Sequence, residues 1–141
     1  MKILKVLLFY VALTFTVHAG QAQTILQVNT LEEVYKACAA KSTDLVGCGS
    51  VFHIEMINVL ENTFTRLSKT FSGDEKKAFD EDFKIWAEER DIFYKDLDYT
   101  FKRKVEMQEW EQSMQSVILD EKTRFLKSKI FALVRNAHKF E

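Results

Sequence analysis

Cys38 and Cys48 are the residues whose type and spacing could most readily do chemistry. Two thiols ten residues apart can form a disulfide in an oxidising compartment, and closing so short a loop stabilises a fold by about 2.5–3 kcal/mol in the chain-entropy model. Two free thiols, or a bridge between two chains, are the alternatives. Whether the two cysteines bond therefore depends on the compartment of the protein. The N-terminal residues predict that compartment.

The N-terminus has the pattern of a cleavable secretory signal. Two lysines near the start and an apolar stretch over residues 3–17 without an acidic residue match the charged and apolar regions of such a signal. Small-residue cleavage sites follow after Ala19 and after Ala22, and we favour the second. The stretch is shorter than the roughly 20 residues of a membrane span, so an uncleaved anchor is the less favoured alternative. We predict a signal peptide over residues 1–22, a periplasmic or secreted location, and no stable membrane anchor after cleavage.

No other group of residues in the exported part has the spacing of a catalytic or metal-binding site. Its histidines, His53 and His138, lack the His-Glu-x-x-His or Glu-x-x-His spacing that places metal ligands on one helix face. A Gly-rich phosphate loop, a Gly-x-Ser-x-Gly sequence and a neighbouring Cys/His pair are also missing. We therefore expect no enzymatic activity, no metal and no cofactor.

Charge and composition predict one small domain with a Phe-rich core. Removing residues 1–22 from the 141-residue chain takes away Lys2 and Lys5, which leaves 119 residues with 18 basic and 21 acidic side chains, a net charge of −3. This balance offers no wide positive field, so we expect no nucleic-acid partner. Aromatic residues make up 13% of the chain, with 12 Phe, and supply enough apolar surface for one modest core over residues 23–141.

The placement of helix breakers predicts a nearly all-helical domain. Proline is absent, and all four glycines precede residue 74. The segment from Thr30 to Glu33 has the Thr-x-x-Glu form of a capping box, which predicts a short helix over about residues 31–40. Residues 41–50, which contain two glycines and are bracketed by the cysteines, are predicted to form a loop.

Apolar residues spaced three and four apart predict the next helices. The first stripe lies between residues 50 and 70 and is followed by a turn at residues 72–74, where glycine favours left-handed geometry. The second stripe begins after residue 75 and continues past residue 100. The two stripes comprise Ile57, Leu60, Phe64, Leu67 and Phe71, and then Phe79, Phe83, Trp86, Phe93, Leu97 and Phe101, with Arg90 on the same line as the second.

A last amphipathic segment starts at about residue 106. One straight helix over residues 75–138 would be roughly 95 Å long at 1.5 Å per residue, so the chain either bends or forms a coiled coil. We place the bend within residues 98–108 and predict an all-α antiparallel bundle of three to four helices, two of them long. The apolar residues of the last segment are Trp110, Met114, Val117, Phe125, Ile130, Leu133 and Val134.

The middle of the chain resembles the lysozyme-inhibitor LprI-like N-terminal domain, a family of secreted bacterial domains. The family combines an early cysteine pair with a Leu-Asn-x-x-Tyr-x-x-Leu helix, a Gln-x-x-Trp-x-x-x-Arg-Asp-x-x-Cys helix and a Thr-x-x-Arg-x-x-x-Leu helix. The resemblance covers roughly residues 38–126. It is carried by Cys38 and Cys48, by Leu60, Phe64 and Leu67, and by Trp86, Arg90 and Asp91.

The resemblance implies a binding protein rather than an enzyme. It implies contact with a protein partner, with lysozyme the candidate given by the family's name. Tyr94 stands where the family has a third cysteine and no later cysteine follows, which implies that the early pair bond to each other. The alternative function is a structural or chaperone-like envelope protein whose long amphipathic helices could pair in a homodimer or hold unfolded clients.

Trp86, Arg90 and Asp91 have both a structural and a functional interpretation. Arg90 and Asp91 are adjacent, so on a helix their side chains point about 100° apart. The favoured interpretation places Arg90 along the Trp86 stripe, where it pairs with an acid on another helix, while Trp86 anchors the core. The other interpretation makes them a contact surface.

Overall fold

The chain folds into an all-α bundle, as the sequence predicts. The computed structural model describes the backbone of residues 2–136 and the side chains of residues 20–136, and every regular element in that range is helical. Within residues 20–136, no helix combines the length and the apolar character of a membrane span. The elements are α1 (Lys2–Lys41), α2 (Leu45–Ser68), α3 (Gly73–Glu106), the short 3₁₀ helix η1 (Gln112–Met114) and α4 (Gln115–Asn136).

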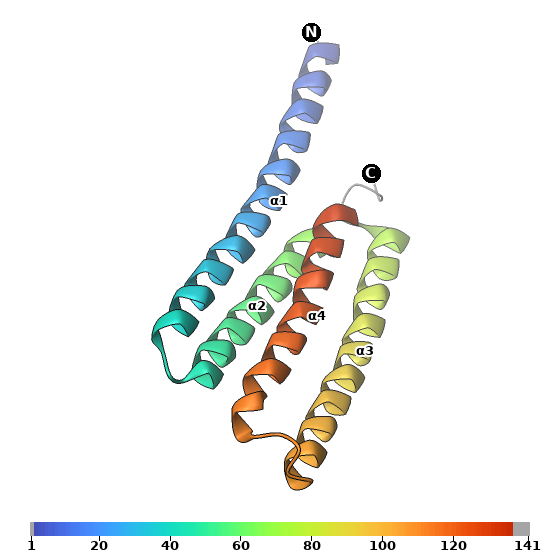
Figure 1. The fold of residues 1–141 in the computed structure, drawn as a ribbon. Coiled ribbons are helices and arrows are strands. Elements are labelled where there is room, and N and C mark those ends of the chain that lie inside the picture. Colours follow the sequence, from blue (N-terminus) through green and yellow to red (C-terminus); the bar gives the residue numbers. More distant parts are fainter. Residues whose placement is uncertain (1, 137–141) are drawn as a thin grey trace.

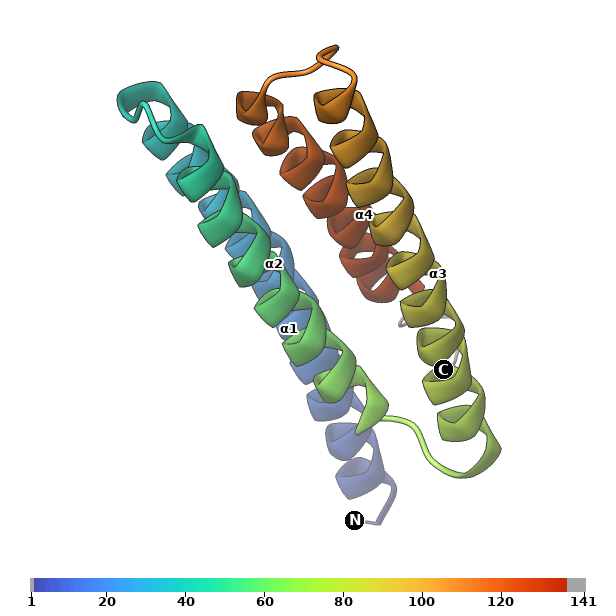
Figure 2. The same cartoon turned by 90° about the horizontal axis from the view of Figure 1, so that it is seen from below.

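The four long helices run up and down, so that helices adjacent in the chain are antiparallel (Figure 1). Helix α1 packs on α2, α2 packs on α4, and α4 packs on α3, which makes α2 and α4 the centre of the bundle. The same view from below shows α3 at one edge and the α1–α2 pair at the other (Figure 2). The outer faces of α1 and α3 are therefore directed away from the centre of the bundle.

The core lies along the seam between α2 and α4 and is closed by α1 and α3. Met56 and Leu60 of α2, Leu126 and Ile130 of α4, and Val28 of α1 have 1% or less of their surface exposed. Burying side chains of this size contributes about 1.5–3 kcal/mol each. These residues form one continuous cluster that joins α1 to the central helices α2 and α4.

Aromatic rings extend this cluster between α2, α3 and α4, as the Phe-rich composition predicts. The ring of Phe64 stacks on Phe83 with centroids 3.8 Å apart and on Phe79 at 5.3 Å. Trp86 lies 5.4 Å from Phe83 and stacks on Phe125 of α4 at 5.8 Å. Stacked aromatic pairs add about 0.5–1.5 kcal/mol beyond burial, so this cluster attaches α3 to the bundle.

The start of the domain differs from the sequence-based prediction. Thr30 does not cap a helix; it lies inside α1, and its hydroxyl donates to the carbonyl of Leu26 at 2.9 Å. Glu33 pairs with Lys36 rather than with a free amide. The predicted helix start at residue 31 is therefore wrong, because the Thr-x-x-Glu pattern also occurs on the surface of a continuous helix.

The predicted loop over residues 41–50 is also wrong. Only residues 42–44 separate the helices, and α2 begins at Leu45 with Asp44 as its N-cap. The Asp44 carboxylate accepts a hydrogen bond from the amide of Gly47 at 2.8 Å. The two glycines thus lie in the first turns of α2, where a capped helix start tolerates them.

The chain reverses direction at the C-terminal edge of the predicted bend. Residues 98–100 stay helical, and α3 ends at Glu106. Gln108 adopts a left-handed conformation with φ of 58°, and the amides of Glu109 and Trp110 both donate to the carbonyl of Lys104. A glutamine here takes the position that glycine usually occupies after a helix, so no glycine marks this turn in the sequence.

The last helix begins later than predicted, and most of its predicted apolar face is buried. Helix α4 starts at Gln115 instead of near residue 106, and of the predicted residues Val117 is exposed. The predicted Ile130, Leu133 and Val134 are buried, Phe125 packs against the core, and Ile118 and Leu126 are buried in addition.

We expect the substitution Gln108→Gly to increase the free energy of unfolding by about 0.5–1 kcal/mol. The left-handed conformation is strained for a residue with a Cβ atom but not for glycine, and this gain exceeds the entropy that glycine adds to the unfolded chain. Urea denaturation measures the change. Gln108→Ala, which keeps the Cβ atom, should show no gain; a glycine variant less stable than the parent would contradict the expectation.

Candidate functional site

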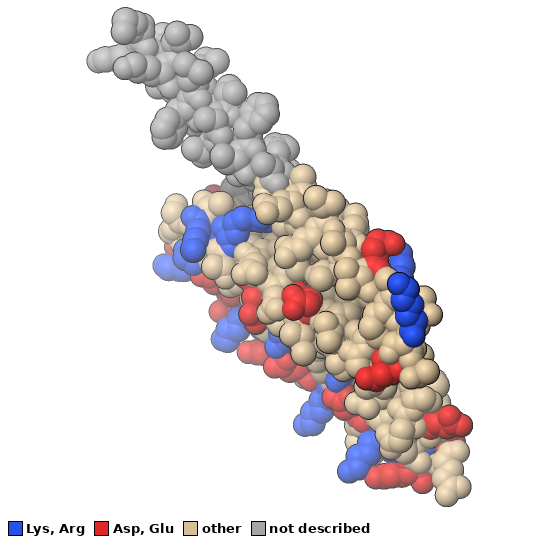
Figure 3. Space-filling view, turned by 90° about the vertical axis from the view of Figure 1, so that its left-hand side faces the viewer, with Lys and Arg blue, Asp and Glu red and all other residues tan. Residues whose placement is uncertain are grey.

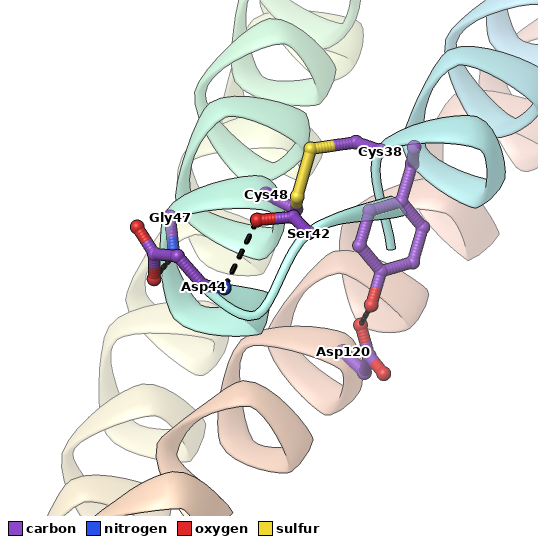
Figure 4. The surroundings of a disulfide bond; sticks show 7 residues. Cys38, Ser42, Asp44, Gly47, Cys48 and Asp120 are labelled. Carbon is purple, nitrogen blue, oxygen red and sulfur yellow. Dashed lines mark hydrogen bonds between the residues drawn. A yellow bond between two sulfur atoms is a disulfide. The ribbon is translucent and has the colours of Figure 1, made fainter. Parts of the chain in front are cut away.

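A disulfide closes one end of the bundle. Cys38 in the last turn of α1 is bonded to Cys48 in the first turn of α2, with their Cα atoms 5.9 Å apart, and the predicted pairing is therefore confirmed (Figure 4). Cys48 is buried. The bridge ties together the two helices on either side of the short link.

Local hydrogen bonds make this link rigid. The hydroxyl of Ser42 accepts from the amide of Asp44 at 2.9 Å, and Asp44 in turn caps α2 at Gly47 (Figure 4). A Cβ atom added at Gly47 would lie 2.2 Å from the Asp44 carboxylate, so only glycine permits this close approach without a shift of the cap. The disulfide and the cap together fix how α1 enters α2.

An apolar pocket of about 420 Å³ lies between α1 and α2 beside the disulfide. Its walls include Leu31, Val34 and Tyr35 of α1 and Val51 and Phe52 of α2. The acidic residues that line it are Asp44 and Glu55. Ligand pockets are typically about 300–1,000 Å³ and mostly apolar, so this pocket has the size and lining of a binding site.

The surface around the pocket is partly apolar. Residues 45–54 of α2 contain no Asp, Glu, Lys or Arg, and neither do residues 20–31 of α1, of which only Leu31 lines the pocket. On the α1 side of the molecule, uncharged surface covers a broad area and the charged side chains lie mainly towards its edges (Figure 3). Val34 and Val51 are 60% and 63% exposed, so apolar surface continues outward from the pocket. Exposed apolar patches of this kind mark contact sites more often than isolated apolar residues do.

Tyr35 connects the pocket to the centre of the bundle. Its ring stacks on Phe52 with centroids 4.8 Å apart, and its hydroxyl donates to the carboxylate of Asp120 on α4 at 2.7 Å. Burial, followed by the hydrogen bond to Asp120 and the charge of that carboxylate, raises the pKa of Tyr35 to about 12. The neutral phenol is therefore the form that the folded state favours.

We expect Tyr35→Phe to lower the free energy of unfolding by about 1 kcal/mol at neutral pH, because it removes a hydrogen bond to a charged acceptor in a partly buried place. The folded-state pKa of Tyr35 lies above its ordinary value of 10.0. The stability that this group contributes is complete below pH 10 and is lost as the pH rises towards 12. The difference between parent and variant should therefore shrink across that interval when urea unfolding is measured at several pH values. A difference that stays constant to pH 12 would contradict this role.

The residues that carry the family resemblance lie away from the pocket. Leu60 and Leu67 are buried in the core, with Phe64 packed against it, and Trp86 is buried beneath two cations. The guanidinium of Arg90 and the ammonium of Lys129 lie 5.6 and 5.5 Å from the Trp86 ring centroid. None of the six motif residues outside the cysteine pair lines the pocket: Leu60, Phe64, Leu67, Trp86, Arg90 and Asp91.

The predicted partner of Arg90 is wrong. Its Nε and Nη2 atoms both donate to the carboxylate of the adjacent Asp91, at 2.9 and 2.7 Å, and no hydrogen bond among the described residues joins Arg90 to an acid on another helix. Long side chains can curve towards each other even when their Cα–Cβ bonds diverge by 100°. The ion pairs between α3 and α4 are instead made by Lys129 with Asp82 and by Lys122 with Asp98.

His53 lies in a half-buried polar cluster between α2, α3 and α4. Its Nδ1 atom is 3.0 Å from the hydroxyl of Thr123, and its ring is tilted against Tyr94 with centroids 5.5 Å apart. Burial, together with the charges of Lys122 and Arg90, lowers the pKa of His53. Within residues 20–136 no group of His, Cys, Asp and Glu has metal-binding geometry, and His138 lies outside the described residues.

The pocket could not be located from the cysteines alone. Its walls depend on α1 packing along α2, which the sequence does not show; the uncharged segment 45–54, which lines the α2 side, is a usable local signal. Comparisons with protein-family models, with curated proteins and with solved structures find no match for this chain. The resemblance to the LprI-like family therefore stays a prediction.

Proposed function

We propose that the chain is an exported helical binding protein that contacts a protein partner through the α1–α2 face at the disulfide end and carries no catalytic activity. The apolar pocket beside the Cys38–Cys48 bridge is the observation that carries this proposal. Export is supported by the N-terminal signal pattern and by the disulfide, which is stable in an oxidising compartment.

A protein partner suits this surface better than a small molecule. The pocket can receive one apolar or aromatic anchor side chain, and the exposed Val34 and Val51 extend the contact beyond it. Protein interfaces typically have such a buried anchor surrounded by flatter contacts. Because the disulfide and the cap hold the walls in place, little ordering is needed on binding, which favours affinity.

The resemblance to LprI-like domains supports lysozyme as the first partner to test. The exported protein, purified with its disulfide intact, is added in micromolar excess to lysozyme acting on a cell-wall substrate. We expect turnover to fall. The variant Val51→Glu, which places a charge in the pocket wall, should restore turnover, while Val117→Glu, a matched change at an exposed valine of α4, should not. Unchanged turnover with the parent protein would reject lysozyme as the partner.

A structural or chaperone-like role in the cell envelope is the second candidate. The exposed apolar side chains of Leu26, Val34 and Ile54 favour it, because such residues can hold unfolded chains. Suppression of the aggregation of a denatured client protein, lost in Val51→Glu, would support this function. No effect on aggregation would reject it.

The exported form can be defined by intact mass. Cleavage after Ala22 removes Gly20, which packs against the guanidinium of Arg66, and the buried Gln21, whereas cleavage after Ala19 keeps both. We expect a product that begins at Gln23. A mass that includes residues 1–19 would reject cleavage of the signal.

A further inference from the structure

Helix α3 has an apolar stripe on the side that faces away from the bundle. Ile85, Ile92 and Tyr99 recur at intervals of seven residues and are 50%, 63% and 63% exposed. Seven residues are close to two helical turns, so the three side chains lie almost in line. Helix α3 forms one edge of the bundle (Figures 1 and 2), which leaves this line open along the helix.

Charged residues flank the stripe with the same seven-residue period. On one side, Glu81 and Glu88 are followed by Lys95 and Lys102, so the charge changes sign near Ile92. All four side chains are exposed. Within the chain, Glu81 pairs with Lys84 at 3.8 Å and Lys102 pairs with Glu106 at 3.9 Å. Such long, exposed ion pairs contribute little stability. This flank is therefore free to pair with another charged surface.

We propose that a second copy of the chain packs antiparallel along this stripe of α3, with Ile92 at the two-fold axis. In that register Ile92 lies beside Ile92 of the second copy, and Ile85 lies level with Tyr99. A two-fold axis brings the same flank of both helices together. Glu88 then lies within one residue of the level of Lys95 of the second copy. Glu81 likewise lies within one residue of the level of Lys102 of the second copy.

The other flank agrees in part with this register. Asp82, which also pairs with Lys129 of its own chain, lies within one residue of the level of Arg103 of the second copy, which is favourable, whereas Glu89 lies near Asp96, which is not. In a parallel two-fold pair opposite flanks face each other, so Glu81 would lie level with Asp82 of the second copy, Glu88 with Glu89 and Lys102 with Arg103, and only Lys95 with Asp96 would be favourable. The charge pattern therefore selects the antiparallel arrangement.

This surface is separate from the pocket of the proposed function, since it lies on α3 and the pocket lies between α1 and α2. Sedimentation equilibrium of the exported protein at micromolar concentrations tests the dimer. Ile92→Glu places two like charges at the axis and should weaken the dimer by about 100-fold or more. Ile54→Glu, a matched change at an exposed isoleucine of α2, should leave it intact. A parent protein that stays monomeric at high micromolar concentration, or a dimer that is equally sensitive to both variants, would overturn the proposal.

Charge reversal tests the direction of pairing. Glu88→Lys and Lys95→Glu should each weaken the dimer by roughly tenfold, because each brings like charges together at two symmetric places. Combining the two substitutions in one chain restores opposite charges in the antiparallel register and should recover the parent affinity. A double variant as weak as the single variants would overturn the antiparallel arrangement. Circular dichroism checks that every variant retains its helices.

Discussion

Leu126→Ala is expected to lower the free energy of unfolding by about 2.7–5 kcal/mol, the range observed when a fully buried leucine is truncated in a packed core. Leu126 has none of its surface exposed and belongs to the cluster that includes Met56, Leu60 and Ile130. The substitution removes buried methyl groups and leaves a cavity at the centre of the seam between α2 and α4. Urea denaturation followed by circular dichroism measures the loss, and Tm should fall by roughly 10 °C or more.

Leu26→Ala is the matched control for this prediction. Leu26 lies on α1 with 66% of its surface exposed, so its truncation should change stability by no more than about 0.5 kcal/mol. Equal losses in the two variants would show that Leu126 is not in the core of the protein in solution.

Removal of the disulfide is expected to cost about 2.5–3 kcal/mol of stability, because the bridge closes a short loop between Cys38 and Cys48 and limits the unfolded chain. The double variant Cys38→Ala/Cys48→Ala should show this loss without a reducing agent. It should also loosen the wall of the pocket, which both cysteines line, so partner binding should weaken together with stability.

A reducing agent provides the control for the bridge. Dithiothreitol should destabilise the parent protein to the level of the double variant and should have no effect on the double variant itself. A reduced parent protein that kept its full stability would show that the disulfide contributes nothing to stability, and this would contradict its proposed role in holding the pocket wall.

Much of the helical architecture could be predicted from the sequence because apolar spacing is a local signal. The stripe from Ile57 to Leu67 lies on α2, with its last predicted member, Phe71, in the link after the helix, and the stripe containing Phe79 and Trp86 lies on α3. The helix ends were harder to predict. Gln108 adopts a left-handed conformation without the usual glycine, and the glycines near Cys48 lie inside a helix because Asp44 caps it.

Helix α1 illustrates what local signals miss. Its segment from residue 20 to 31 has neither charges nor a clear apolar period, yet Val28 is fully buried and Thr24 nearly so. These residues are positioned by packing against α2, which depends on the whole bundle. The disulfide could be predicted because it follows from two cysteines ten residues apart together with the oxidising compartment that the N-terminal pattern predicts. The pocket beside it could not, because its walls come from two helices whose packing no short pattern encodes.

The order of the helices has a consequence for how the chain folds. Two hairpins, α1 with α2 and α3 with α4, join neighbours in the sequence, whereas the seam between α2 and α4 joins segments separated by the whole of α3. Bringing distant segments together costs loop-closure entropy before any contact is gained. We therefore expect the hairpins to form early and their docking to limit the folding rate. If seam contacts form mostly after the transition state, truncations there should accelerate unfolding more than they slow folding and shorten the lifetime of the native protein.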